Sequence, residues 1–179
     1  MEKFSEKTIT VPDGISVHVQ NNVVKLSMGG QEVQKKFSCR AIELRGENGS
    51  IRVVSKNGKK KTLATANAIA SHIVNLYKGI SKNFEYRLEV VYSHFPMSIL
   101  VKDKFVEISN IAGAKMPKRA KIVGNAKVVV KGKDITVSAA NKEHAGQTSA
   151  NLEAATKSSG KDKRVFQDGI YIVSKAKTQ

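Results

Sequence analysis

Clusters of lysine and arginine are the residues of this sequence whose types and spacing could do chemistry, and that chemistry is the binding of phosphate. One cluster lies within residues 114–121, AKMPKRAK, which we expect to join two strands. A second lies within residues 157–164, KSSGKDKR. The cations are Lys115, Lys118, Arg119 and Lys121 in the first cluster, and Lys157, Lys161, Lys163 and Arg164 in the second. Contacts of such groups with phosphate oxygens supply affinity and register without reading a base sequence.

A third run of cations, Lys59, Lys60 and Lys61, follows Gly58 at the expected start of a helix. A nucleotide-binding P-loop would need another glycine five positions before Gly58, but that position is Val53 and no glycine lies between them. We therefore reject nucleotide hydrolysis. The N–H groups and the dipole of a helix N-terminus favour an anion. Two interpretations stay open, an RNA phosphate site and a solvated run of charge.

Groups suited to catalysis or metal binding are sparse. The four histidines show no metal-ligand spacing with one another or with Cys39. His144 beside Glu143 is more simply a pair at a helix start than an acid–base couple. The acidic residues are scattered, which disfavours an enzyme that cuts nucleic acid with bound metal ions. The sequence predicts a protein that is not an enzyme and has no metal, no cofactor and no small-molecule substrate.

The charge balance predicts a polyanionic partner. The 179 residues contain 31 Lys and Arg against 15 Asp and Glu, a formal net charge of +16. Self-repulsion on that scale does not stabilise an isolated domain, which favours a polyanionic partner. The alternative is a basic protein whose charge only keeps it soluble. One cysteine cannot form an internal disulfide, and no apolar run approaches the ~20 residues of a membrane helix. The N-terminal residues lack a signal-peptide pattern. We expect a cytosolic protein without membrane contact.

The sequence repeats itself. Residues 15–27, ISVHVQNNVVKLS, align without a gap with residues 97–109, MSILVKDKFVEIS, at an offset of 82. Further on, residues 50–53 resemble residues 134–137 at an offset of 84. Both 13-residue stretches read as two alternating runs around a turn, which is typical of a β-hairpin. An internal duplication is the simplest account, with each half containing a hairpin, further strands, one helix and a closing strand.

Hydrophobic periodicity predicts the elements that position the cations. Apolar residues three and four apart predict helices over residues 60–78 and 141–158, the second with Asn141 as N-cap. Alternating runs predict strands over residues 8–11, 15–20, 23–28, 51–55, 86–92, 128–130 and 135–138. The predicted class is α+β, with two tandem duplicated domains. Each domain would be a mostly antiparallel β-sheet with one α-helix packed on it. Phe95-Pro96 suits a stiff connection between domains of residues 1–95 and 96–179.

Three stretches together resemble one family. They are TITVPDGISVHVQNNVVKL, YRLEVVYSHFP and DKRVFQDGIYIV, in this order along the chain. In combination they are similar to the large-subunit ribosomal protein L-six family, in its archaeal and eukaryotic branch, over essentially the whole chain. The bacterial branch ends with a more Pro- and Tyr-rich version of the last stretch, so contacts of bacterial members do not transfer residue by residue.

The resemblance implies a cytoplasmic structural protein of the large ribosomal subunit, part of the ribonucleoprotein that performs translation. It implies binding of large-subunit ribosomal RNA, mainly by the C-terminal domain, near the sarcin–ricin loop and the stalk base. Neighbouring ribosomal proteins and translational GTPases would lie nearby. The RNA-facing residues that it suggests are Lys115, Lys118, Arg119, Lys157, Lys161, Lys163, Arg164, Gln167 and Asp168. We expect Asp168 to form a turn with Gly169 rather than to face phosphate, because a carboxylate repels a polyanion.

The basic segment of residues 157–168 directly precedes an apolar run, residues 170–173, IYIV. We expect this run to be the last strand of the C-terminal sheet, held by burial of either Ile170 and Ile172 or Tyr171 and Val173. An anchored loop loses less entropy on meeting RNA than a free tail does. The rival hypotheses are a basic DNA-architectural or RNA-chaperone-like protein and an enzyme acting on nucleic acid.

Overall fold

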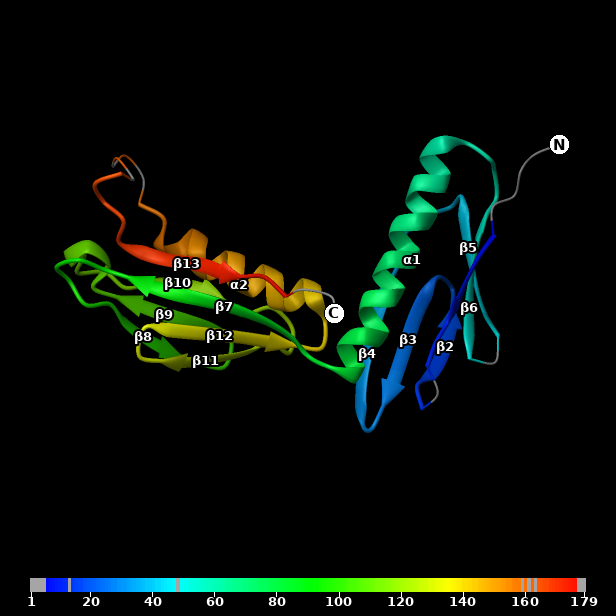
Figure 1. Cartoon of the computed structure of the whole chain (residues 1–179), viewed down its shortest axis with the longest axis horizontal. Helices are drawn as coiled ribbons and strands as arrows, with labels where there is room; N and C mark the ends of the chain where they lie inside the picture. Colours follow the sequence, from blue (N-terminus) through cyan, green and yellow to red (C-terminus); the bar gives the residue numbers. More distant parts are fainter. Residues whose placement is uncertain are drawn as a thin grey trace. The chain divides into compact units, whose positions relative to one another are not determined.

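The computed structural model of the protein describes residues 6–12, 14–47, 49–158, 160, 162 and 164–176. The chain forms two compact units, Met1–Lys82 and Asn83–Gln179 (Figure 1). Each unit contains two antiparallel sheets and one α-helix. The predicted α+β class and duplicated plan are therefore confirmed, with two sheets in each unit rather than one. Neither described helix is long and apolar enough to span a membrane.

The N-terminal unit has six strands and the longer helix. Its elements are β1 (Glu6–Thr10), β2 (Ser16–Gln20), β3 (Val23–Met28), β4 (Gln31–Lys36), β5 (Ile42–Glu47), β6 (Ser50–Ser55) and α1 (Lys60–Ser81). The strands pair in the orders β1-β6-β5 and β2-β3-β4. Ile69, Ile73 and Leu76 of α1 are buried, because their spacing puts them on one helix face. They share one core with buried residues of both sheets.

The C-terminal unit repeats this order and adds a strand after its helix. Its elements are β7 (Phe84–Val91), β8 (Ser98–Val101), β9 (Phe105–Ser109), the 3-10 turn η1 (Ile111–Gly113), β10 (Lys118–Lys121), β11 (Lys127–Lys131), β12 (Asp134–Ala139), α2 (Lys142–Thr156) and β13 (Gly169–Ser174). Strands β10-β9-β8 form a small sheet, and β11-β12-β7-β13 form a larger one. The predicted N-cap of α2 is confirmed, because Oδ1 of Asn141 accepts a hydrogen bond from the backbone N–H of Glu143 at 2.9 Å.

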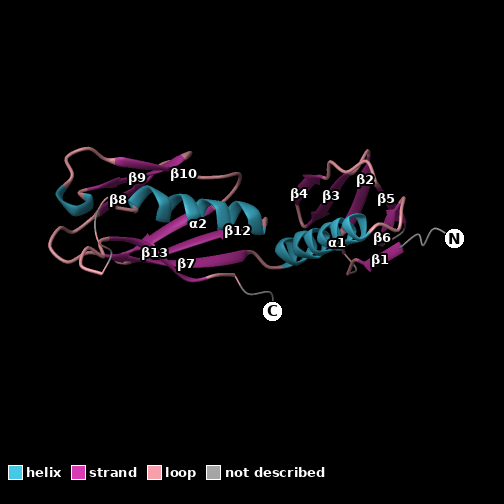
Figure 2. Cartoon of the chain, turned by 90° about the horizontal axis from the view of Figure 1, so that it is seen from above, coloured by secondary structure: helices cyan, strands magenta, loops and turns pink. Residues whose placement is uncertain are grey.

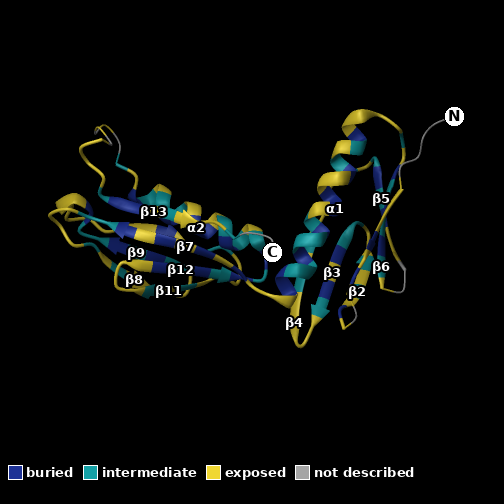
Figure 3. Cartoon of the chain, in the orientation of Figure 1, coloured by how far each residue is buried: buried dark blue, intermediate teal, exposed yellow. Residues whose placement is uncertain are grey.

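One face of the four-stranded sheet carries the core of this unit. Helix α2 and strands β8–β10 lie on the same side of β7, β12 and β13 (Figure 2). Buried residues of α2, β7, β9, β10, β12 and β13 form a single cluster, among them Leu88, Ile108, Ile135 and Leu152, and the partly buried Ile99 of β8 packs against it. Buried and exposed residues alternate along β7, as expected for a strand covered on one face only (Figure 3).

The duplication is visible in the strand register. Ser16 pairs with Ser27 in the β2–β3 hairpin, and Ser98 pairs with Ser109 in the β8–β9 hairpin, both shifted by 82 positions. The turn of the first hairpin contains Asn21, whose φ of 47° lies in the left-handed region that asparagine tolerates. The β5–β6 and β11–β12 hairpins are related in the same way at an offset of 84. The repeated unit is therefore a backbone pattern as well as a sequence pattern.

Strand β7 lies in a different unit from the one that the sequence predicted. The predicted boundary after residue 95 assigned this strand to the first domain, as its closing strand. In the structure β7 pairs with β12 and β13, and the compact units divide after Lys82. Because β1 pairs with β6 as β7 pairs with β12, β7 corresponds to β1 and opens the second repeat. Strand β13 follows the helix of its unit, whereas among the described residues of the first unit no strand follows α1.

Three described strands fall outside the predicted ones. Strands β4 and β5 lie at the edges of their sheets, and the sequence QEVQKK of β4 offers a single apolar residue. Strand β10, KRAK, was predicted as part of a connection. Only Ala120 of β10 is buried, and its three charged residues are exposed. A strand with so few apolar residues is not recognised from hydrophobic alternation.

Candidate nucleic-acid interface

The basic loop, residues 157–168, joins α2 to β13 and is fastened where it begins and ends. Oγ1 of Thr156, the last residue of α2, accepts a hydrogen bond from the backbone N–H of Ile170 at 2.9 Å. Both residues are 1% exposed. The Thr156 hydroxyl lies 3.3 Å and 3.1 Å from the carbonyls of Leu152 and Glu153, to which it donates. Of the two predicted anchoring pairs, the one led by Ile170 is confirmed, and Tyr171 and Val173 are exposed instead.

The far end of the basic loop is tied to the end of β7. Oδ1 of Asp168 accepts a hydrogen bond from the backbone N–H of Ser93 at 3.0 Å. Asp168 is half-buried, whereas Gln167 beside it is exposed. This carboxylate thus ties the end of the basic loop to the segment that follows β7.

A turn also orders the middle of the basic loop. The carbonyl of Asp162 accepts hydrogen bonds from the N–H groups of Val165 at 3.1 Å and Phe166 at 2.9 Å. Its Oδ1 accepts a further one from the N–H of Arg164 at 3.0 Å. The Arg164 side chain is 92% exposed, with Nε 3.7 Å from Oδ1 of Asp162. Such a turn presents the guanidinium to solvent from a defined backbone.

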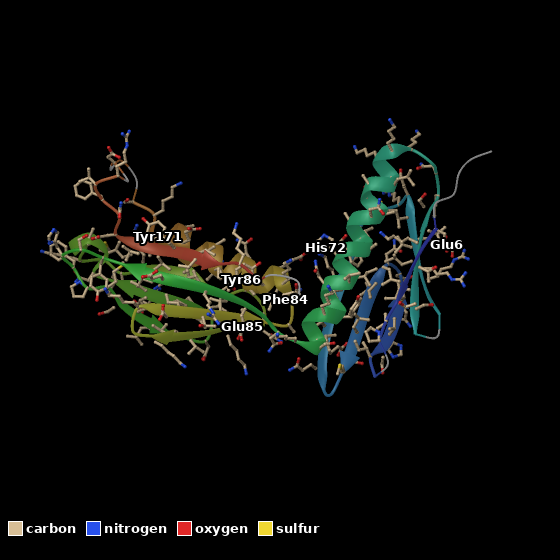
Figure 4. The ribbon with its side chains drawn as sticks, in the orientation of Figure 1. Glu6, His72, Phe84, Glu85, Tyr86 and Tyr171 are labelled. Carbon is tan, nitrogen blue, oxygen red and sulfur yellow. The ribbon has the colours of Figure 1, made fainter. Side chains whose placement is uncertain are left out.

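The predicted cations of the basic loop are exposed wherever the structure describes them. Lys157 follows α2 directly and is exposed, as are Arg164 and Gln167. Lys161 and Lys163 lie outside the described residues. In the side-chain view the loop lies above the label of Tyr171, a residue of β13 (Figure 4).

The first predicted cluster, within residues 114–121, belongs to the small sheet. Lys115 is exposed in the segment before β10, and Lys118 and Arg119 are exposed on β10 itself. The Arg119 guanidinium lies 5.0 Å from the centre of the Phe105 ring, and its Nη2 lies 3.9 Å from Oε1 of Glu107. These contacts hold Arg119 across the outer face of β9, the strand with which β10 pairs.

Lys102 completes this group, and sequence reasoning missed it. Its Nζ forms an ion pair with Oε2 of Glu107 and lies 5.4 Å from the centre of the Phe105 ring. The signal that could have found it is the alternation of residues 105–109, which puts Phe105 and Glu107 on one face. A hydrogen bond from Lys102, with added attraction from Lys102 and Arg119, lowers the pKa of Glu107 below its ordinary value. The carboxylate therefore stays ionised and holds both cations.

One connecting loop, residues 92–97, links the two clusters. Its Ser93 is bonded to Asp168, as described above. Its Pro96 carbonyl accepts a hydrogen bond from Nδ2 of Asn110 at 3.0 Å, just before η1. The Phe95 ring lies about 3.5 Å from where a Cβ on Gly113 would stand. Both clusters therefore lie at the end of the C-terminal unit where β7 finishes (Figures 1 and 2).

The third predicted cluster belongs to the other unit. Lys59 is the N-cap of α1, and Lys60 and Lys61 begin the helix; all three are exposed. No side chain caps this helix start among the residues that the structure describes. The structure therefore does not bring these lysines together with the C-terminal clusters in one unit.

The arrangement suits phosphate binding better than catalysis. Within the described ranges, no three His, Cys, Asp or Glu residues gather as they would around a metal ion. Exposed cations on a strand and on a loop held at its ends can contact a nucleic-acid backbone at several points. Phe105, between Lys102 and Arg119, holds the cations in place instead of lying bare for base stacking.

Sequence comparison finds proteins that are similar to this chain over nearly its whole length. No family model matches the chain. Large ribosomal subunit protein uL6 of Methanobrevibacter smithii is 41% identical over 93% of this chain and 94% of its own length. The protein of the same name from Methanococcus vannielii is 42% identical over 94% of this chain and 92% of its own. That from Methanosarcina mazei is 41% identical over 98% of this chain and its full length. At such identity across both units, the chain belongs to the uL6 family of large ribosomal subunit proteins.

Proposed function

We propose that the C-terminal unit of this ribosomal protein binds large-subunit ribosomal RNA through the basic loop and β10. As a uL6 protein the chain is a structural constituent of the large ribosomal subunit in the cytoplasm, not an enzyme. The proposed RNA contacts are Lys115, Lys118, Arg119, Lys157, Lys161, Lys163, Arg164 and Gln167. Asp168 instead ties the basic loop to the backbone of Ser93, after the end of β7.

The fastening of the basic loop is the observation that carries this proposal. Thr156 and Asp168 fix its two ends, and Asp162 orders a turn between them. The entropy of ordering a loop is then lost on folding instead of on binding, which leaves more of the phosphate attraction as affinity. Arg119 is held in the same way by Glu107 and Phe105.

The finer location that we propose is the region of the sarcin–ricin loop and the stalk base. Its support is the resemblance of the three sequence stretches to the family's archaeal and eukaryotic branch. There the chain would have neighbouring ribosomal proteins and translational GTPases close by. Lys59, Lys60 and Lys61 would make a separate, weaker phosphate contact, since they are exposed at a helix N-terminus.

Crosslinking in assembled large subunits tests the proposed contacts. Subunits that contain the chain are irradiated, and peptide–nucleotide adducts are mapped by mass spectrometry. We expect ribosomal RNA adducts within residues 157–168 and at residues 115–119. Adducts confined to the N-terminal unit would contradict the assignment of the main contact. Recovery of the chain with DNA, and not with large subunits at moderate salt, would instead favour the DNA-architectural alternative.

A further inference from the structure

A pocket lies at the root of the basic loop, between the last turns of α2 and the first residues of β13. Its volume is about 360 Å³, which falls in the size range of pockets that hold small ligands. Thr156 and Ile170 join its two sides through the hydrogen bond described above. The pocket is therefore part of the fastened end of the loop.

The walls of the pocket are small and mostly apolar, with one aromatic ring. Ala150 and Ala154 of α2 contribute methyl groups, and Gly169 has no side chain. The Tyr171 ring lies 3.5 Å from where a Cβ on Gly169 would stand, and Tyr171 is 39% exposed. An accessible aromatic ring beside small residues suits a second planar ring, because bases stack on such side chains.

Two charged residues line the same pocket, one helical turn apart. Lys157 is exposed and belongs to the proposed RNA contact. Glu153 is half-buried, and its carboxylate has no hydrogen-bond or ion-pair partner within the described part of the chain, Lys157 included. A carboxylate repels phosphate, but it accepts hydrogen bonds from the amino group of a base.

We propose that this pocket binds one unpaired base of the ribosomal RNA whose phosphates the basic loop contacts. The base would stack on Tyr171 and donate from its amino group to Glu153, while Lys157 meets a neighbouring phosphate. RNA is the occupant because Lys157 lines the pocket and the RNA contact alike. An apolar side chain of another protein would cover Glu153 without giving its carboxylate a partner, which is costly. The inference rests on the proposed function, and it adds recognition of a base to contacts that read no sequence.

Filling the pocket tests this proposal. Ala154→Phe puts a ring there from an exposed helix position and leaves the charge unchanged. The affinity of the full chain for a fragment of large-subunit rRNA should fall at least about fivefold, the effect of losing one stacked base. The slope of log affinity against log salt should not change, because the phosphate contacts remain. Ala68→Phe, at an exposed position of α1, is the control and should leave the affinity unchanged.

Unchanged affinity in Ala154→Phe would overturn the proposal. A loss of affinity with a smaller salt slope would also overturn it, because the new ring would then displace phosphate contacts. The proposed function fails by a different result, an unchanged salt slope when Lys161, Lys163 and Arg164 are replaced by alanine.

Removing the carboxylate gives a second test, in which a mere bystander would show the opposite sign. Glu153→Ala takes away a negative charge, which by itself strengthens the attraction to RNA. Because the carboxylate accepts from the base in this proposal, the affinity should instead fall at least about fivefold. Glu85→Ala removes the same charge at an exposed position of β7 and should not weaken binding. Equal or tighter binding by Glu153→Ala would overturn the proposal.

Discussion

Single hydroxyl and carboxyl groups hold the basic loop in place. Thr156 lies at the junction of α2, the loop and β13, where its oxygen accepts from Ile170 while its hydrogen points to the last turn of the helix. Valine has nearly the same shape but offers no acceptor. The N–H of Ile170 is buried with its residue, so losing Thr156 Oγ1 leaves it without a partner.

We expect Thr156→Val to lower the free energy of unfolding by about 1–3 kcal/mol, the usual cost of an unpaired buried donor. Thr65→Val is the control, because the Thr65 hydroxyl also donates to a helix carbonyl but is exposed. Its effect should stay within about 0.5 kcal/mol. Urea denaturation of both variants gives the values. Equal effects of the two substitutions would show that the Ile170 contact contributes nothing.

Glu107 predicts a dependence of stability on pH. Its folded pKa lies below the ordinary value of 4.5, so the folded state holds the ionised form more strongly than the unfolded state does. This contribution is present above pH 4.5 and is lost as the pH falls through the lower folded pKa. Thermal unfolding between pH 6 and pH 3 should therefore show a shallower loss of Tm in Glu107→Gln than in the parent chain. Parallel curves would contradict the assigned pKa direction.

At the scale of elements, helix α2 fastens the segment between β10 and β11. Thr148 Oγ1 accepts from the N–H of Val123 at 3.0 Å, and Nδ2 of Asn151 donates to the carbonyl of Lys121 at 2.8 Å. Gly124 has a φ of +58°, and a Cβ there would stand 2.2 Å from Nδ1 of His144. The helix can lie this close only because residue 124 has no side chain.

Gly124→Ala should therefore cost more stability than its backbone conformation alone explains. Gly132→Ala is the matched control, since Gly132 has a φ of +61° but nothing within 4 Å of a Cβ. The control should lose about 1–2 kcal/mol, the cost of a left-handed alanine. Gly124→Ala should lose about 1–3 kcal/mol beyond that through overpacking. Chemical denaturation compares them, and equal losses would mean that His144 moves aside freely.

The sequence predicted elements well where the local pattern decides and less well where distant pairing decides. The two hairpins at an offset of 82 were readable because alternation and turn residues are local signals. Strand β7 was found as a strand, but its partners β12 and β13 lie more than 40 residues away, so its unit was assigned differently. Arg119 was found by its charge. Lys102 was missed although its partner Glu107 is only five residues further along, because the two side chains meet only once the β8–β9 hairpin has formed.

At the scale of the whole molecule, the two units each bury a core of their own. Leu26 and Ile108 occupy equivalent positions in these cores, and both are fully buried. The division after Lys82 gives the C-terminal unit all four strands of its larger sheet. A division after residue 95 would remove β7 from between β12 and β13.

Two fragments distinguish these boundaries. A fragment of residues 83–179 should fold, with cooperative thermal unfolding followed by circular dichroism, because it holds β7 to β13 together. A fragment of residues 96–179 should show no cooperative transition, because β12 and β13 lose the strand that joins them. Cooperative unfolding of the shorter fragment would show that β7 is dispensable and would restore the boundary at residue 95.

The salt dependence of binding to a large-subunit rRNA fragment tests the central claim that the basic loop contacts phosphate. Replacing Lys161, Lys163 and Arg164 by alanine should reduce the slope of log affinity against log salt by roughly 2–3, at about 0.7–0.9 for each lost contact. Replacing the exposed Lys127, Lys131 and Lys175 by alanine lowers the net charge equally and should leave the slope nearly unchanged. Equal slopes for the loop variant and the parent chain would contradict the account.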